Sequence, residues 1–281
     1  MKNINEGKGI SDTIKEDTNK IWYLFKLNSY STHTYKFGND KLNYKDITIN
    51  FNHINNYYSN ISIDKSNKIT VNIGIPTNGK EKNVKENITH ELTHLIEILG
   101  LNNKDYPKYN KIKISLIEFN KYPMSTAMGF ITDVFYKTLH NEINANVAQT
   151  YIYVKDDGRC TKEEAIKRLN EWDTYKFYNN IKNIKLEILF TKISKQEVIT
   201  FNNILIKNGV KTISSDDIMV WLNYWFKTFK RKSDVFLKNS ERILKEIEKD
   251  WEIFEKYVSN TYDSTKIIDY TTYISNYKKA T

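Results

Sequence analysis

Two histidines four residues apart in a helical pattern limit the folds open to this 281-residue chain. Residues 90–94 read His-Glu-Leu-Thr-His, and residues 84–99 repeat their apolar positions with the 3.6-residue period of an α-helix. The apolar positions form a single stripe, and His90 and His94 lie roughly opposite it. We therefore expect the stripe to pack on one layer of the protein while the two imidazoles face a cleft or a second layer.

The residues before this helix predict a small β-sheet. Residues 47–51 and 69–75 alternate apolar and polar side chains, as half-buried strands do. Asn83 then stands where a helix N-cap is expected, and Gly100 stands where a left-handed residue would end the helix. The sequence thus predicts an N-terminal sheet packed on the apolar stripe of the helix at 84–99.

Helical patterns dominate the rest of the chain. Residues 124–154 predict two helices that meet near His140, and Thr161 and Ser194 each begin a capping box with a glutamate three residues later. A long helical region, from about 215 to 258, is rich in aromatic residues. Such stripes usually pack inside a domain, but they also offer a surface for an assembly partner.

The cysteine and apolar content argue against a cysteine-based metal site and against a membrane-spanning segment. Cys160 is the only cysteine, so a metal site within this chain must use histidines and carboxylates. The first 20 residues carry charges throughout, and no later segment is apolar enough to cross a membrane. We expect a cytoplasmic protein with no membrane partner.

The net charge of +9 raises the question of nucleic acid. All but four of the 43 basic residues are lysine, whereas base and phosphate recognition favours the arginine fork. The lysines are also spread along the chain. We therefore expect a solvated basic surface rather than a nucleic-acid partner.

The histidine pair predicts a metal ion. Side chains four apart on a helix lie one above the other, so His90 and His94 can both coordinate one Zn²⁺ ion. Glu91 is rotated by about 100° from His90, and would reach the water on the metal rather than the metal. Zinc lowers the pKa of such a water toward about 7, and a carboxylate beside it can take up the proton and pass it to a leaving amine.

A third ligand is suggested by Asn-Glu-Ile-Asn-Ala-Asn at 141–146. With His-Glu-Leu-Thr-His, this segment resembles the gluzincin, thermolysin-like branch of the zincin metallopeptidases, whose second helix carries Asn-Glu-x-x-Ser-Asp. The resemblance implies that Glu142 is the third zinc ligand, and it covers about residues 65–155. Asn146 replaces the family's aspartate, which accepts a hydrogen bond from the first histidine. A neutral amide would hold that imidazole less strongly.

Other residues compete for roles at the site. His140 is an alternative ligand or a substrate contact, although side chains two apart diverge on a helix. Glu97 shares the face of the histidines but is expected to be a solvated or outer carboxylate. Tyr151 and His140 are candidates to stabilise the oxyanion, the negatively charged oxygen that forms during peptide hydrolysis.

The resemblance also implies that substrate lies along an edge strand before the helix. Residues 67–75 are the candidate for this strand, and the alternative is that they form an interior strand.

Together these features predict an α+β protein. A small N-terminal β-sheet packs on a zincin helix pair in a metallopeptidase core, residues 1–156, and a mostly α-helical C-terminal subdomain covers 157–281. The expected function is zinc-dependent hydrolysis of a peptide or protein substrate, with Glu91 as general base and His90, His94 and Glu142 holding the metal. The alternative is an inactive zincin fold with a structural role in a viral or phage assembly, associated with the virion.

Overall fold

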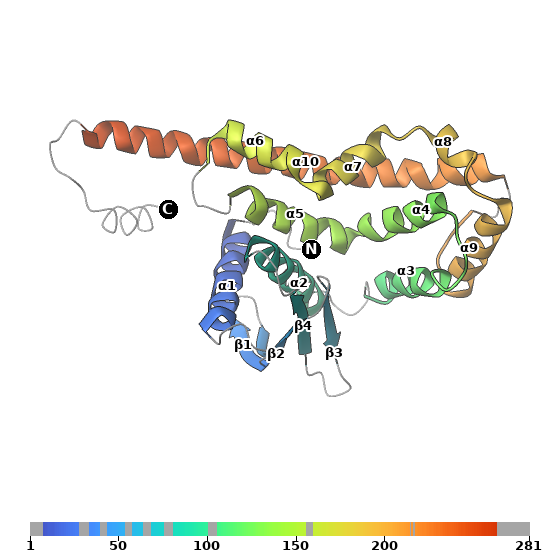
Figure 1. The fold of residues 1–281 in the computed structure, drawn as a ribbon, viewed down its shortest axis with the longest axis horizontal. Helices are drawn as coiled ribbons and strands as arrows, with labels where there is room; N and C mark the ends of the chain where they lie inside the picture. The colour runs from blue at the N-terminus through green and yellow to red at the C-terminus, as the bar shows by residue number, and fades with distance from the viewer. Residues whose placement is uncertain are drawn as a thin grey trace.

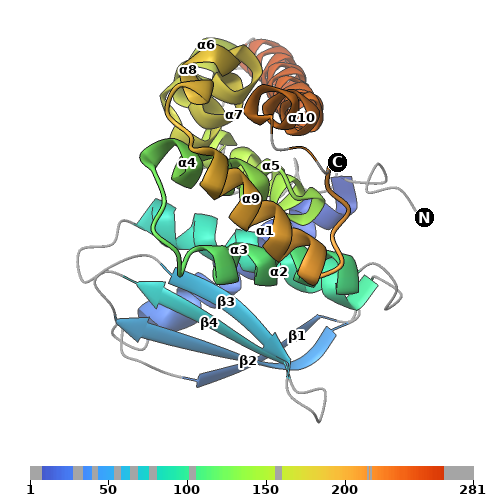
Figure 2. The ribbon, with the colours of Figure 1, turned by 90° about the vertical axis from the view of Figure 1, so that its right-hand side faces the viewer.

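The protein consists of a small sheet with its covering helices and a larger helical part (Figure 1). The two parts meet where α2 (Glu81–Gly100) packs against α5 (His140–Lys155). The computed structural model describes residues 8–27, 34–39, 44–53, 58–63, 69–75, 81–100, 106–155, 160–213, 215 and 217–262. In the view of Figure 2 the sheet lies at the base, helices cover it, and the C-terminal helices form the opposite side. The expected α+β class, with a small sheet and mostly helical content, is confirmed.

The sheet has four strands in the order β1-β2-β4-β3. Their bounds are β1 (Thr34–Asn39), β2 (Tyr44–His53), β3 (Tyr58–Ile63) and β4 (Ile69–Ile75). The central pair, β2 and β4, is parallel, and both outer pairs are antiparallel. The two predicted strands are β2 and β4, while β1 and β3 were not predicted. Alternation places one set of side chains in the core: Ile47, Ile49, Val71 and Ile73.

Two helices cover the buried face of the sheet. They are α1 (Lys8–Leu27) and α2 (Glu81–Gly100). The predicted stripe of α2 is buried, with Ile88, Leu92 and Leu95 at most 2% exposed. They join the strand residues and Ile14, Ile21 and Trp22 of α1 in one hydrophobic cluster, which we call the sheet core. The helix predicted for 84–99 is thus confirmed, but α2 runs from Glu81 to Gly100. The predicted N-cap at Asn83 was therefore wrong, because the helix begins two residues before it.

The remaining helices form the larger part. They are α3 (Tyr106–Phe119), α4 (Thr126–Lys137), α5 (His140–Lys155), α6 (Lys162–Glu171), α7 (Asp173–Asn183), α8 (Leu186–Phe190), α9 (Lys195–Lys207) and α10 (Ile218–Tyr262). The predicted helix pair that meets near His140 is α4 and α5. Both predicted capping boxes form, at Thr161 and at Ser194. Gly209 follows α9 with a φ of 71°, which favours glycine.

The long helix α10 runs along the helical part (Figure 1). Its aromatic residues Trp221, Phe226 and Phe229 are buried in a second cluster, the helical core, which extends from Leu116 to Ile247. These three side chains are therefore core residues, and an assembly partner for the C-terminal aromatic helices stays a prediction. The side chain of Phe254 lies outside the described residues.

The two cores divide the described chain between α2 and α3. The sheet core draws on residues up to Ile96, whereas the helical core already includes α3, α4 and α5. The sequence divided the chain at 156 instead, and that domain boundary stays a prediction. Within the described ranges, no helix is both long and apolar enough to span a membrane.

Candidate metal centre

The candidate site lies where α2 packs against α5. Because the stripe of α2 faces the sheet core, its opposite face is free to meet α5. Ala145 of α5 is fully buried, and its small side chain suits a close approach between two helices. Farther along, the side-chain amide Nε2 of Gln149 donates to the backbone carbonyl of Glu86 at 3.2 Å. These contacts set how the two helices are aligned.

Three predicted ligands converge at this contact. His90 Nε2 lies 3.3 Å from Glu142 Oε2, and His94 Nε2 lies 3.3 Å from Glu142 Oε1. The two imidazole Nε2 atoms are 3.0 Å apart. Within the part of the chain that the structure describes, these residues form the one group of three or more metal-binding side chains.

The donor set fits a tetrahedral ion such as zinc. Zinc binds imidazole nitrogen and carboxylate oxygen at about 2.0–2.2 Å, so two ligand atoms on a tetrahedron lie about 3.3–3.5 Å apart. Each Nε2 lies one such edge from a Glu142 oxygen, His90 from Oε2 and His94 from Oε1, and the separation of the two Nε2 atoms is slightly shorter. Two imidazoles and one carboxylate leave a fourth position for a non-protein ligand.

The carboxylate of Glu142 is the most deeply buried of the three candidate ligands. Its side chain is 2% exposed, against 16% for His90 and 12% for His94. Burial alone would raise the pKa of Glu142, but hydrogen bonds from the two imidazoles hold this pKa well below its ordinary value. Glu142 is therefore ionised at neutral pH. An ionised carboxylate is the form that a cation requires.

Glu91 lies between the histidines on α2. Its side chain is 5% exposed, so this carboxylate is placed in the interior rather than on the solvated face of the helix. A buried glutamate next to a histidine ligand is in the sequence position required of a general base. That role stays a prediction.

Asn146, one turn after Glu142, forms a hydrogen bond with α7. Its Nδ2 donates to the hydroxyl of Tyr178 on α7 at 2.9 Å. Tyr178 in turn donates to the backbone carbonyl of Lys137, just before α5 begins, at 2.5 Å. Burial raises the pKa of Tyr178 above its ordinary value. The sequence identified Asn146 but gave no signal for Tyr178, which is distant along the chain.

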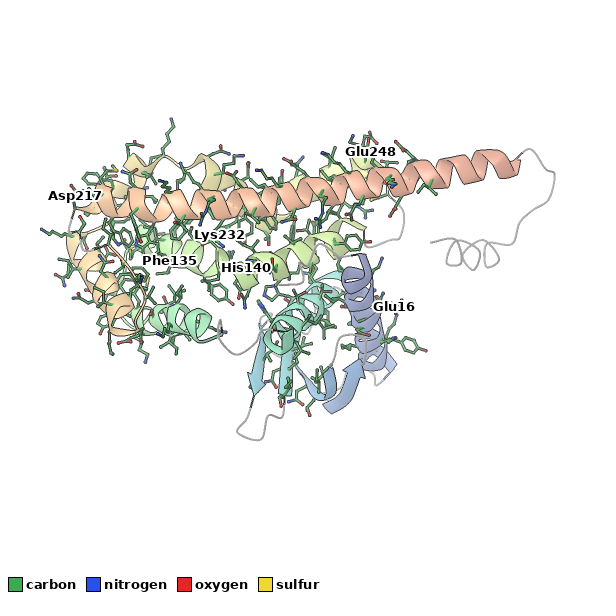
Figure 3. All side chains as sticks on the ribbon, turned by 180° about the vertical axis from the view of Figure 1, so that it is seen from behind. Glu16, Phe135, His140, Asp217, Lys232 and Glu248 are labelled. Carbon is green, nitrogen blue, oxygen red and sulfur yellow. The ribbon has the colours of Figure 1, made fainter. Side chains whose placement is uncertain are left out.

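The other predicted site residues are not part of the three-residue group. His140 is exposed at the first turn of α5 (Figure 3), where its Nε2 lies 3.3 Å from Nδ2 of Asn144. Tyr151 is half-buried, with the ammonium of Lys15 on α1 located 6.0 Å from its ring centre. A role for either in binding substrate or stabilising an oxyanion stays a prediction. The side chain of Glu97 is outside the described residues.

The strand proposed to bind substrate is not an edge strand. The segment at 67–75 contains β4, which pairs with β2 on one side and with β3 on the other. The prediction of an edge was wrong because β3 precedes β4 in sequence but adds to its outer side. The edge next to β4 is β3.

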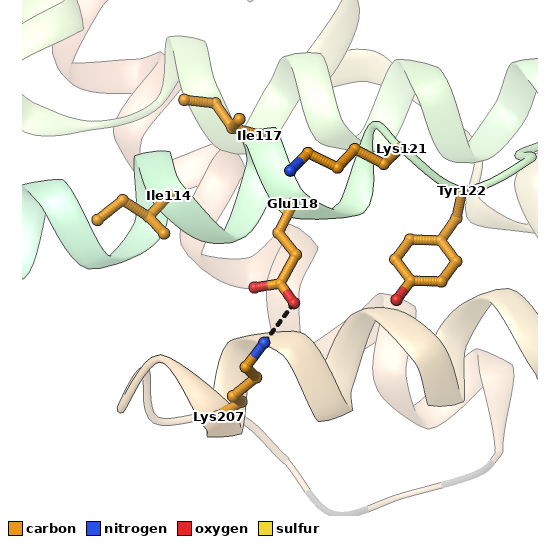
Figure 4. Close-up of a pocket in the computed structure, with 6 residues that line it drawn as sticks. All are labelled: Ile114, Ile117, Glu118, Lys121, Tyr122 and Lys207. Atoms are coloured by element: carbon orange, nitrogen blue, oxygen red, sulfur yellow. Dashed lines mark hydrogen bonds and ion pairs between the residues drawn. The ribbon is translucent and has the colours of Figure 1, made fainter.

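A pocket lies away from the three ligands, between α3 and α9 (Figure 4). It measures about 420 Å³, and Glu118 and Lys207 form an ion pair of 2.6 Å across it. Ile114, Ile117 and Tyr122 supply exposed apolar surface. None of the residues lining it belongs to the candidate metal centre.

Comparison with known proteins adds no relative, since no family model, curated protein or solved structure matches the chain.

Proposed function

We propose that this chain is a zinc metallopeptidase of the gluzincin type. The observation that carries the proposal is the convergence of His90, His94 and Glu142 from two helices, with mutual separations that suit one tetrahedral ion. The motifs at 90–94 and 141–146 predict the same three residues as ligands independently of the structure. Two histidines that merely faced solvent would have no reason to meet an ionised carboxylate from another helix.

The residues of the chain divide the proposed work. His90, His94 and Glu142 would hold the ion, which as a Lewis acid would acidify water and polarise the carbonyl of a peptide substrate. Glu91 would take up a proton from water and give it to the leaving amine. Its burial supports this role, because the carboxylate lies in the interior beside the two histidines and not on the solvated face of α2.

A second candidate function is a zinc-binding structural protein without peptidase activity, as in a viral or phage assembly. The observation that favours it is Asn146, whose amide NH₂ group contacts Tyr178 where the resembled family has a carboxylate. A neutral residue there would support the first histidine less strongly.

Zinc content and peptide cleavage separate these functions. The chain is stripped with a chelator, reloaded with zinc and assayed against a broad peptide library. We expect one zinc per chain and cleavage that falls by a factor of about 10² or more in Glu91→Gln, the size of a general-base contribution. Glu163→Gln, which changes an exposed carboxylate on α6, is the matched control and should cleave normally.

Each result has a distinct meaning. Cleavage that survives Glu91→Gln would contradict the general-base assignment. One bound zinc without any cleavage by the wild type would favour the structural function. A wild-type chain that binds no zinc would overturn the metal centre itself.

A further inference from the structure

Tyr178 links three parts of the chain through one buried hydroxyl. Its side chain is fully buried, and its ring stacks on Phe236 of α10 with centroids 4.0 Å apart and planes 23° from parallel. The hydroxyl donates to the carbonyl of Lys137 and accepts from Asn146. The ring is thus held by α10 while the hydroxyl contacts the end of α4 and the middle of α5.

The chemistry of this hydroxyl decides which way the amide of Asn146 points. A tyrosine hydroxyl has a single proton to donate, and the proton of Tyr178 is used by the Lys137 carbonyl, which can only accept. Tyr178 can therefore only accept from Asn146, so the amide must direct Nδ2 toward it. The carbonyl oxygen Oδ1 of Asn146 is then directed elsewhere, as a hydrogen-bond acceptor.

The alignment of α2 and α5 places Asn146 at a level of α2 just before the first histidine. Glu142 meets His90 and His94, and seven residues later Gln149 meets the carbonyl of Glu86. The two helices thus run antiparallel. Asn146 lies between these contacts and so at the level of α2 between Glu86 and His90, away from His94.

His90 has the group that such an acceptor would serve. Its Nε2 faces Glu142, while its Nδ1 is buried and has no hydrogen-bond partner among the described residues. An imidazole that binds a metal through Nε2 carries its proton on Nδ1 and needs an acceptor there. A buried N–H group without an acceptor is unfavourable, because it has lost its hydrogen bonds to water.

We propose that Tyr178 is a positioning residue for the metal centre: it fixes the amide of Asn146 so that Oδ1 accepts the Nδ1–H of metal-bound His90. This inference rests on the metal site of the proposed function but not on peptidase activity. It also assigns a role to the helical core, since the tyrosine that orients the ligand comes from α7.

The test is a double-mutant cycle on zinc affinity, measured by competition with a chromogenic chelator. Tyr178→Phe keeps the stacked ring and removes the hydroxyl, which leaves the amide free to turn. We expect zinc to bind about 10–100-fold more weakly, the usual effect of losing an outer partner of a ligand. Tyr175→Phe is the matched control, because this half-buried tyrosine also lies on α7 and faces Phe236, with centroids 6.5 Å apart. Its zinc affinity should equal that of the wild type.

The cycle is completed in the Asn146→Asp background. Both oxygens of an aspartate accept hydrogen bonds, so its orientation needs no tyrosine to fix it. Tyr178→Phe should therefore weaken zinc binding by less than about threefold in that background. A tyrosine that only held α7 against α5 would cause the same loss in both backgrounds, and equal losses would overturn the proposal.

Asn146→Ala tests the proposed hydrogen bond between His90 and Asn146 directly, and it serves as a second variant in case Tyr178→Phe fails to fold. It should weaken zinc binding as much as Tyr178→Phe does, and the absorption bands of bound Co²⁺ should shift because the His90 imidazole has lost its acceptor. Wild-type affinity in Asn146→Ala would refute the role of Tyr178 while leaving the metal site intact. A wild-type chain without zinc affinity would overturn both.

Discussion

Zinc should stabilise the whole fold, because its proposed ligands come from both hydrophobic cores. His90 and His94 lie on α2, which packs in the sheet core, and Glu142 lies on α5, which packs in the helical core. Unfolding of either core would separate the ligands and release the ion. The full free energy of zinc binding therefore opposes the unfolding of each part.

The size of this stabilisation follows from linkage. At a free zinc concentration about 1,000 times the dissociation constant, a ligand that binds only the folded chain adds about 4 kcal/mol to the free energy of unfolding. Each kcal/mol raises the melting temperature of a chain of this size by about 2–4 °C, which gives a shift of about 10 °C. Differential scanning calorimetry with zinc and with excess chelator measures it directly.

Two variants make the measurement specific to the site. His94→Ala removes a ligand and should lose the zinc-induced shift almost completely. Glu91→Gln keeps all three ligands and should retain it. If His94→Ala showed the same shift as the wild type, zinc would be binding elsewhere, and the assignment of the three ligands would be wrong.

Two further predictions concern residues outside the three ligands. His140→Ala should leave the zinc dissociation constant unchanged in chelator competition, since His140 is exposed and outside the ligand group; a large loss would place it among the ligands. The carboxylate of Glu197 accepts hydrogen bonds from backbone N–H groups at the starts of α4 and α9. Partial burial alone would raise the pKa of Glu197, but these hydrogen bonds lower it from the ordinary 4.5. Its stabilising effect is therefore present above about pH 4.5 and is lost as the pH falls through the lowered pKa. Glu197→Ala should cost about 1–2 kcal/mol in urea unfolding at pH 7 and much less at low pH, and an equal cost at both would contradict the capping role.

The metal centre was the part of the structure most open to sequence reasoning. His90 and His94 are related by one helical turn, so their proximity depends only on local structure. The apolar stripe of α2 also fixed which side of the helix would be buried against the sheet. The prediction of Glu142 depended on the family resemblance of the segment 141–146, because helix periodicity alone does not predict that α5 packs against α2.

The sequence did not predict which strand forms the sheet edge, nor that Tyr178 contacts Asn146. A strand pattern shows that a segment is extended, but not which neighbour it pairs with, so β4 could be assigned as a strand and its interior place could not. Tyr178 is one of 20 tyrosines, and it reaches Asn146 only through the packing of α7 and α10. Long-range contacts of this kind have no periodic signal in the sequence.

The burial of the site offers a physical reason for an amide at position 146. Asn146 is 7% exposed and lies one turn from Glu142, which is 2% exposed. An aspartate there would put a second carboxylate into the same buried contact, and without a metal ion the two like charges would disfavour the folded chain. An amide avoids that cost, but an amide has a donor end and an acceptor end, so its orientation must be fixed. The hydroxyl of Tyr178, already committed as a donor to Lys137, is the group in this structure that fixes it.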